Sequence, residues 1–260
     1  MYRTIEIAQD SSGVATLTLN RPEKRNAMSG EMISELTAAS RRLGTDDTIR
    51  AVILAANGEV FCAGGDLSWM QTMMAADAPT RHEEAMKLAK MLHALNTMPV
   101  PMIGKVQGNA FGGGVGLMSV CDMVIADKTA QFGLTETKLG LIPATIGPYV
   151  IARMGEAKAR SVFMSSQIFS SDEAVRLGLV SHAVTKTKLN SAVQAQIEPY
   201  LACAPGAVAE AKALARAFGP VIDANAIDQT VDALVKRWDS DEAAEGIAAF
   251  FEKRKPHWQD

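Results

Sequence analysis

The sequence is poor in the features that mark a specialised class of protein. Its three cysteines, Cys62, Cys121 and Cys203, are too few and too far apart for a disulfide framework, so we expect reduced thiols that fill the core. No run of 18 or more apolar residues occurs, so a membrane-spanning helix is not expected. The formal net charge of −3 removes the simplest argument for a nucleic-acid partner, because no basic excess is present to neutralise phosphates.

Several short motifs are missing as well. The first ten residues carry charges at Arg3 and Glu6 and lack a signal-peptide core, so we expect a cytoplasmic protein. The four histidines have no metal-ligand spacing, and the sequence after His82 lacks the second histidine of H-E-x-x-H, so no metal site is predicted. The chain also lacks a Rossmann glycine motif, a phosphate-binding loop and a G-x-S-x-G nucleophile turn. Metal chemistry and hydride transfer therefore have no support.

Strand patterns alternate with helix patterns over most of the chain, which predicts an α/β fold with parallel strand pairing. Ser29 is the expected start of one helix and Gly44 its end, Pro79 is expected to break a later helical stretch, and Ser170, Glu173 and Gly178 form the start and end signals of another. From about residue 191 the pattern is helical, so we place a boundary between a core, 1–190, and a C-terminal helical region, 191–260. The expected strands lie at 5–8, 14–20, 49–56, 99–106 and 122–127.

One segment of the chain is repeated. Residues 51–67, AVILAANGEVFCAGGDL, align without gaps on residues 101–117, PMIGKVQGNAFGGGVGL, with identical isoleucine, glycine, phenylalanine, glycine and leucine positions at a constant offset. A repeated strand, turn, glycine and helix is typical of units stacked in a superhelix. Each copy would then bring a glycine-lined backbone to the start of a helix.

Two such turns that faced one point would form an anion site. The first N–H groups of a helix have no partner within the helix, and glycine allows a ligand to approach the backbone closely. Two N–H donors on one oxygen make an oxyanion hole, which suits a carbonyl that becomes an enolate. Tight turns with close helix packing would explain the same glycines without any ligand, and the glycines alone favour this second interpretation.

Five segments together resemble the crotonase, or enoyl-CoA hydratase/isomerase, superfamily: NRPEKRNAMS at 20–29, FCAGGDL at 61–67, GNAFGGGVGL at 108–117, AQFGLTETKLGLIP at 130–143 and SSDEAVRLGLVSHAV at 170–184. The resemblance extends from about residue 4 to residue 255. It implies a crotonase-like (ClpP/crotonase) spiral of ββα units with a C-terminal helical trimerisation region. It also implies an acyl-CoA thioester as substrate, no cofactor other than this coenzyme A, and a homotrimer or dimer of trimers.

The resemblance also assigns residues. It makes Gly65 and Gly113 the two N–H donors to the thioester oxygen and Glu136 the carboxylate that transfers protons. It places Arg25, Ala27, Ala63, Asp66, Leu67 and Lys253 along the coenzyme A, with Arg25 and the cations at 253–255 near its phosphates. Asp66 can also be the N-cap of the following helix, and we favour this role over a catalytic one. Arg25 and Lys253 fit solvated surface charges as well as phosphate ligands.

The sequence departs from the family pattern at Gly116. Many hydratases of this family have a second glutamate there, in G-G-G-x-E, whereas this chain reads GGGVGL. The segments GGDLSWM, GNAFGGGVGLMSVCDM and LGLIPATIGPYV are similar to bacterial methylglutaconyl-CoA hydratases of leucine breakdown, which also have glycine at that position. We therefore predict an enoyl-CoA hydratase, with branched and carboxylated acyl groups, such as that of methylglutaconyl-CoA, among its candidate substrates. The alternatives are a Δ3,Δ2-enoyl-CoA isomerase with one glutamate and a non-catalytic acyl-CoA-binding protein.

Overall fold

The fold is built on a six-stranded sheet with a smaller three-stranded sheet beside it. The computed structural model describes residues 2–259. The large sheet has the strand order β1-β2-β3-β4-β6-β9, in which only the β1–β2 hairpin is antiparallel. The small sheet has the order β5-β7-β8. The strands are β1 (Ile5–Gln9), β2 (Val14–Leu19), β3 (Ala51–Ala56), β4 (Met102–Val106), β5 (Ala110–Phe111), β6 (Met123–Asp127), β7 (Gln131–Gly133), β8 (Phe169–Ser170) and β9 (His182–Val184).

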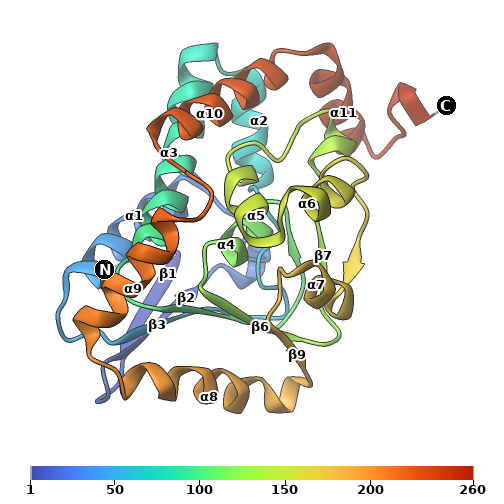
Figure 1. Ribbon diagram of the computed structural model, residues 1–260. Helices are drawn as coiled ribbons and strands as arrows, with labels where there is room; N and C mark the ends of the chain where they lie inside the picture. Colours follow the sequence, from blue (N-terminus) through green and yellow to red (C-terminus); the bar gives the residue numbers. More distant parts are fainter. Residues whose placement is uncertain (1, 260) are drawn as a thin grey trace.

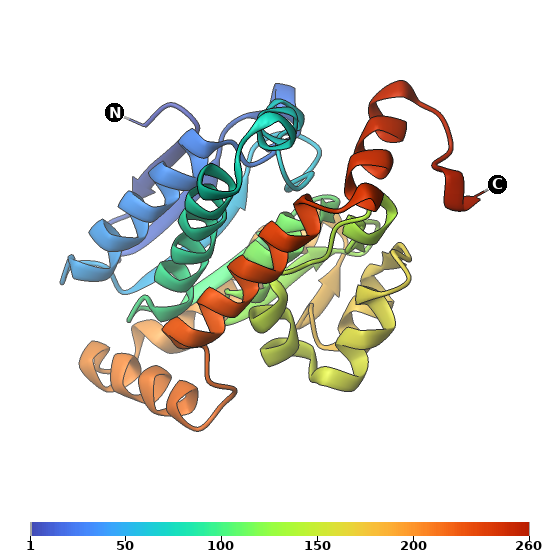
Figure 2. The same ribbon diagram turned by 90° about the horizontal axis from the view of Figure 1, so that it is seen from above.

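Helices cover both faces of the large sheet. Helix α8 lies along one face and packs on β3, β4 and β6, whereas α1, α3 and α10 lie side by side on the other (Figures 1 and 2). The helices are α1 (Gly30–Thr45), α2 (Leu67–Ala75), α3 (Ala78–Thr97), α4 (Gly113–Ser119), α5 (Gly147–Met154), α6 (Glu156–Phe163), α7 (Ser171–Leu177), α8 (Leu189–Leu201), α9 (Pro205–Ala217), α10 (Ala224–Trp238) and α11 (Asp241–Glu252). Within residues 2–259, no helix is both long enough and apolar enough to span a membrane.

The structure confirms that the internal repeat has a spatial counterpart. Strands β3 and β4 are adjacent and parallel, and Ile53 pairs with Ile103, the residue to which the repeat aligns it. The turns after the two strands also bond to each other, because Phe61 donates its backbone N–H to Asn109 and Phe111 donates to Cys62, each at 3.0 Å. The two glycine turns are therefore stacked at the same edge of the sheet.

Most of the predicted helix signals are confirmed. The Ser29 side chain accepts from the Met32 N–H at 3.2 Å, Ser170 accepts from Glu173 at 3.3 Å, and Gly178 ends α7 with φ of 88°. Such side-chain acceptors satisfy amide groups that have no partner within the helix.

Three local predictions are wrong. Gly44 lies inside α1, which ends at Thr45, and a Cβ there would be in tight contact with Pro99 Cδ at 3.2 Å, so the glycine is a close-packing position and not the helix cap. Pro79 belongs to the first turn of α3, and the break between α2 and α3 falls at residues 76–77. Proline is well tolerated in that turn because its missing N–H would be unpaired anyway. Cys203 is exposed, whereas Cys62 and Cys121 are buried as expected.

The C-terminal helices are divided between two places. Helix α8 closes a cluster of buried aliphatic side chains under the sheet, among them Ile103, Ile125 and Val193. Helices α10 and α11 instead form a second cluster with α2 and α3, in which Val231 and Ile247 are fully buried. The division of the chain at residue 190 stays a prediction.

Candidate active site

The two glycine turns meet at one point of the molecule. A Cβ added to Gly64 would lie 3.1 Å from the carbonyl oxygen of Phe111 and 3.9 Å from the amide nitrogen of Gly113. Gly112 has φ of 50°, in the left-handed region that favours glycine. The segment before the first turn joins them, because Met28 donates its N–H to Gly64 at 2.8 Å. Backbone from three parts of the chain is thus in van der Waals contact.

The predicted donors, Gly65 and Gly113, both lie in this contact region. Gly65 lies between two residues that bond to the backbone of Met28. The carbonyl of Gly64 accepts from the Met28 N–H, and the N–H of Asp66 donates to the Met28 carbonyl. Gly113 is the first residue of α4. Within the described part of the chain, neither amide N–H donates to a protein acceptor. Both residues line the same cavity.

Glu136, at the start of the 3-10 turn η2 (Glu136–Leu139), lies beside these glycines. A Cβ added to Gly112 would be 3.1 Å from the carboxylate Oε1. The other oxygen, Oε2, is buried and has no hydrogen-bond partner within residues 2–259. Burial raises the pKa of Glu136 to about 7, against an ordinary value of 4.5, although a hydrogen bond from its own backbone N–H lowers it slightly. A carboxyl group near half-ionisation at neutral pH is suited to accept and return a proton.

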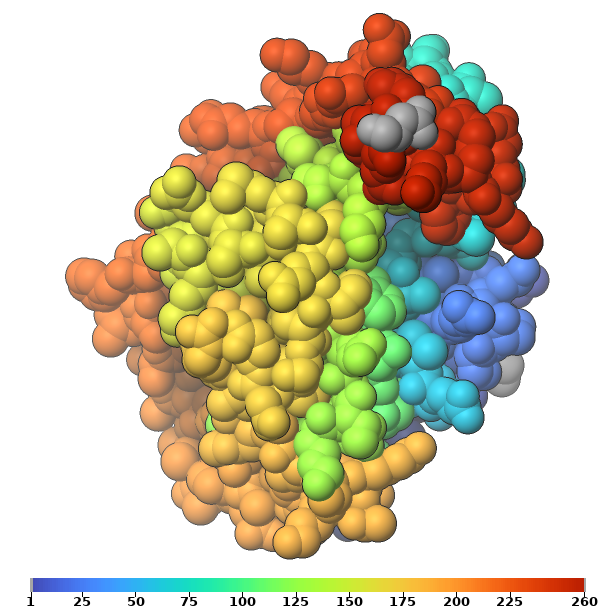
Figure 3. All heavy atoms as spheres, turned by 90° about the vertical axis from the view of Figure 1, so that its right-hand side faces the viewer, coloured from blue at the N-terminus to red at the C-terminus, as the bar shows by residue number. Residues whose placement is uncertain are grey.

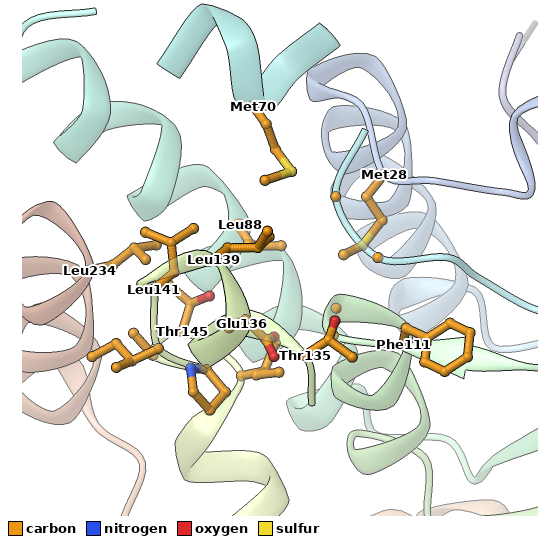
Figure 4. Close-up of a pocket in the computed structure, with 18 of the residues that line it drawn as sticks. Met28, Met70, Leu88, Phe111, Thr135, Glu136, Leu139, Leu141, Thr145 and Leu234 are labelled. Atoms are coloured by element: carbon orange, nitrogen blue, oxygen red, sulfur yellow. The ribbon is translucent and has the colours of Figure 1, made fainter. Parts of the chain in front are cut away.

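The cavity around Glu136 is mainly apolar. It has a volume of about 380 Å³ and lies between the two glycine turns, η2, the loop before α5, and the helices α2, α3, α10 and α11. Its side chains are apolar apart from Thr135, Glu136, Thr145 and the two indole N–H groups of Trp69 and Trp238, and no Lys, Arg or His of the described chain lines it. Figure 4 shows aliphatic side chains of several elements around Glu136. Figure 3 shows the face of the molecule on which the C-terminal segment, in red, lies at the upper right.

The position of the missing second glutamate is filled by another side chain. A Cβ added to Gly116 would lie 2.4 Å from Cγ2 and 2.9 Å from Cβ of Ile146, a distance that real atoms do not tolerate. Ile146 is 3% exposed and lines the cavity. The site therefore has one carboxylate, and the space beside Gly116 holds an aliphatic group.

The residues expected along coenzyme A fall into two groups. Ala63 and Leu67 line the cavity, and Leu67 is 49% exposed at its entrance side. Arg25, Ala27, Asp66 and Lys253 do not line it. Their contacts with coenzyme A, and the roles of Gly65, Gly113 and Glu136, stay predictions.

Asp66 acts as the helix cap that the sequence favoured. Its carboxylate accepts from the backbone N–H of Ser68 at 2.9 Å at the start of α2 and pairs with Arg21 at 3.0 Å. Arg21 also donates to the carbonyl of Ala27 at 2.8 Å, so this pair connects α2 to the segment that contacts Gly64. Asp66 thus positions the first glycine turn from outside the cavity.

Sequence reasoning missed Thr145, Ile146, Trp69 and Trp238 as cavity residues. The first two lie in LGLIPATIGPYV, which the sequence analysis used only as a family mark. The two tryptophans are 169 positions apart in the chain, and their rings meet edge to face with centroids 6.5 Å apart. Nothing in the local pattern of either segment predicts that contact.

Comparison with known proteins agrees with this arrangement. The family model described as enoyl-CoA hydratase/isomerase matches residues 9–260. The "Probable enoyl-CoA hydratase echA8" of Mycobacterium bovis is 34% identical over 261 residues, covering 99% of this chain and 98% of the relative.

Solved structures are similar over the whole chain. An enoyl-CoA hydratase from Shewanella pealeana superposes with a TM-score of 0.82 at 36% identity, covering 99% of this chain and 97% of that one. AtuE of Pseudomonas aeruginosa gives a TM-score of 0.81 at 36% identity, covering 99% and 100% of the two chains. The expected α/β, crotonase-like fold is thereby confirmed. The chain belongs to the enoyl-CoA hydratase/isomerase family of the crotonase superfamily.

Proposed function

We propose that this protein is an enoyl-CoA hydratase, a lyase that adds water across the 2,3 double bond of an enoyl-CoA thioester. The observation that carries the proposal is the carboxylate of Glu136, whose buried Oε2 has no partner within residues 2–259, in one cavity with the amides of Gly65 and Gly113, which donate to no acceptor in the same residues. The relatives whose names describe enoyl-CoA hydratases support the same activity. Coenzyme A enters as part of the substrate, and the reaction needs no further cofactor.

The proposed reaction balances with one carboxylate. Glu136, ionised, accepts a proton from water as the water oxygen bonds to C3, and the electrons of the double bond move to the thioester oxygen. The N–H groups of Gly65 and Gly113 donate to this enolate oxygen, where each donor stabilises the transition state by about 2.7–4 kcal/mol. Glu136 then returns the proton to C2, which restores the carboxylate and completes the addition of one water.

The lining of the cavity bears on the acyl group. The side chains around Glu136 are mostly large and apolar, such as Leu88, Leu141 and Leu234, which suits a branched or extended hydrocarbon. A carboxylated acyl such as methylglutaconyl would have no cation of the described cavity lining to pair with and would rely on the threonine hydroxyls and the indole N–H of Trp238, since the indole N–H of Trp69 donates to Glu84 at 3.2 Å. We therefore keep methylglutaconyl-CoA as one member of a substrate panel beside uncharged branched enoyl-CoA thioesters.

A second function is favoured by one observation. Because Ile146 fills the space beside Gly116, the site has the single carboxylate of a Δ3,Δ2-enoyl-CoA isomerase, which moves a proton between two carbons and adds no water. Incubation with a 2-enoyl-CoA in heavy-oxygen water separates the two functions, since only hydration puts the label into the product. A non-catalytic acyl-CoA-binding protein would bind the panel without turnover, and the presence of Glu136 with both glycine turns in one cavity argues against it. The trimeric or hexameric assembly stays a prediction.

The decisive variant is Glu136→Gln, which keeps the shape of the side chain and removes its ability to carry a proton. We expect kcat on the best enoyl-CoA to fall by about 10²–10⁴-fold, the usual contribution of a general acid–base group. Turnover within a few-fold of wild type, measured by mass spectrometry of the hydroxyacyl product, would contradict the proposed function.

A further inference from the structure

We propose that the hydroxyl of Thr145 holds the attacking water, in the part of the site where relatives of the family place a second glutamate. This inference rests on the proposed hydratase function. It assigns a positioning role to a threonine whose neighbour, Ile146, occupies the space beside Gly116.

Helix α4 relates Thr145 to Glu136 in space. Gly112 and Gly116 are one helical turn apart, and the N–H of Gly116 donates to the carbonyl of Gly112 at 3.1 Å. The Cβ position of Gly112 faces the carboxylate of Glu136 at 3.1 Å, whereas that of Gly116 faces Ile146 at 2.4 Å. Gly112 is the N-cap of α4, with φ of 50° and ψ of −116°, and Gly116 lies in the first turn of that helix. The Glu136 carboxylate and Ile146 therefore contact the same short segment of the chain, at the start of α4.

The hydroxyl of Thr145 has the properties that the role requires. Thr145 is 4% exposed and lines the cavity, and its hydroxyl makes no hydrogen bond to residues 2–259. Figure 4 shows its side chain among those that surround the space next to Glu136. A hydroxyl that lines a cavity and bonds no protein group is available to a water or a ligand in that cavity. Ile146 and Leu141 beside it offer no competing polar group.

Thr135 is the other threonine of the cavity, and the structure favours Thr145 over it. Thr135 directly precedes Glu136 and is only half-buried. Thr145 belongs to a different loop, the one before α5, and is 4% exposed where it lines the cavity. A water held between two groups that approach from different loops has both of its hydrogens and its lone pairs oriented, which a single carboxylate cannot achieve.

The division of roles leaves the balance of the reaction unchanged. One O–H of the water points to Glu136 and loses its proton to that carboxylate. The other O–H stays intact and makes a hydrogen bond to the hydroxyl oxygen of Thr145. The oxygen of the water forms the bond to C3. The threonine gains and loses no proton, so its removal weakens the orientation of water and spares proton transfer at C2.

The test compares two reactions of the same purified protein. Hydration of the best enoyl-CoA needs both Glu136 and the oriented water, whereas exchange of the C2 protons of butyryl-CoA with D2O needs Glu136 and the enolate site alone. We expect Thr145→Val, which has the same shape without the hydroxyl, to lower the kcat of hydration by about 10–100-fold with KM and the exchange rate within about threefold. Thr145→Ser, which restores a hydroxyl, should recover most of the hydration.

The outcomes separate the inference from the function on which it rests. Hydration by Thr145→Val within threefold of wild type, or a loss in Thr135→Val as large as that in Thr145→Val, overturns the role of Thr145. Equal loss of hydration and exchange shows general damage to the site and overturns it as well. A wild-type protein that exchanges C2 protons but hydrates no member of the panel contradicts the hydratase proposal itself. Thr97→Val, whose hydroxyl bonds the carbonyl of His93 outside the cavity, is the matched control.

Discussion

Glu136 makes the folded chain sensitive to pH in the neutral range. Its carboxyl has a pKa of about 7 because it is buried among apolar groups, whereas in an unfolded chain it titrates near 4.5. Between these values the folded chain binds a proton that the unfolded chain does not. The contribution to stability is therefore complete below pH 4.5 and is lost as the pH rises through 7.

Replacing the carboxyl of Glu136 by a neutral amide should remove this loss of folding stability at high pH. We expect Glu136→Gln and the wild type to have similar free energies of unfolding near pH 4.5, and the variant to be more stable at pH 8.5 by up to about 3 kcal/mol. Urea unfolding at a series of pH values measures the difference. A variant that is equally or less stable than the wild type at pH 8.5 would show that burial of the charge does not dominate. This stability gain accompanies the loss of activity, as expected for a group placed for chemistry.

At the scale of single residues, the sequence points to Gly65, Gly113 and Glu136 more readily than to the side chains that surround them. Gly65, Gly113 and Glu136 belong to short motifs, so their identity is readable from a few neighbouring letters, and the structure brings all three to one cavity. The apolar residues around them come from distant elements, such as Leu88 in α3 and Leu234 in α10. Their contact depends on how helices pack across the molecule, which local patterns do not encode.

At the scale of elements, the packing of α4 on the loop before α5 is fixed by the absence of a side chain at Gly116. In a helix interior, alanine is more favourable than glycine by about 1 kcal/mol. Here the added Cβ would lie 2.4 Å from Cγ2 of Ile146, and overpacking of a core costs about 1–3 kcal/mol. The steric cost is the larger of the two.

The sign of this effect should depend on Ile146. We expect Gly116→Ala to destabilise the protein by about 1–2 kcal/mol in the wild-type background. After Ile146→Gly, which removes both colliding atoms, Cγ2 and Cβ, the same change should become neutral or stabilising by up to about 1 kcal/mol. A double-mutant cycle in urea measures the coupling. Gly206→Ala in α9, where an added Cβ meets no atom within 4 Å, is the control, and equal effects in both backgrounds would refute the proposed contact.

Helix starts and the β3–β4 repeat are readable from the sequence because the interactions that set them are short in range. The caps at Ser29 and Ser170 involve residues three positions away, and the repeat of β3 and β4 is a match between two local patterns. The prediction at Gly44 is wrong because the close contact there is with Pro99, more than fifty positions further along the chain. Both the end of a helix and close packing within a helix favour glycine, so the sequence alone does not distinguish the two.

At the scale of the whole molecule, the C-terminal helices support the turn that carries Glu136. A Cβ added to Gly246 in α11 would be 2.6 Å from the carbonyl carbon of Leu139, so backbone packs directly on backbone. Next to this contact, Arg237 at the end of α10 donates to the carbonyl of Gly140 with Nε at 2.9 Å and also pairs with Glu242. The sequence placed these helices in a separate region and offered no sign that they support the active site.

This arrangement predicts that a change about a hundred positions from Glu136 will alter its chemistry. In Gly246→Val the added side chain must displace the backbone of η2 from α11, because the neighbouring atoms are main chain and cannot rotate away. A displacement of about 1 Å can reduce turnover by roughly 10²-fold, so we expect kcat to fall by about 10–100-fold with a smaller change in KM. Water that enters around Glu136 should also lower its pKa from about 7 towards 4.5, and the acid limb of the kcat–pH profile should move to lower pH. Gly206→Val in α9, where the added group meets open space, should change neither quantity. A Gly246→Val protein with wild-type turnover and an unmoved acid limb would show that η2 holds Glu136 in place without α11.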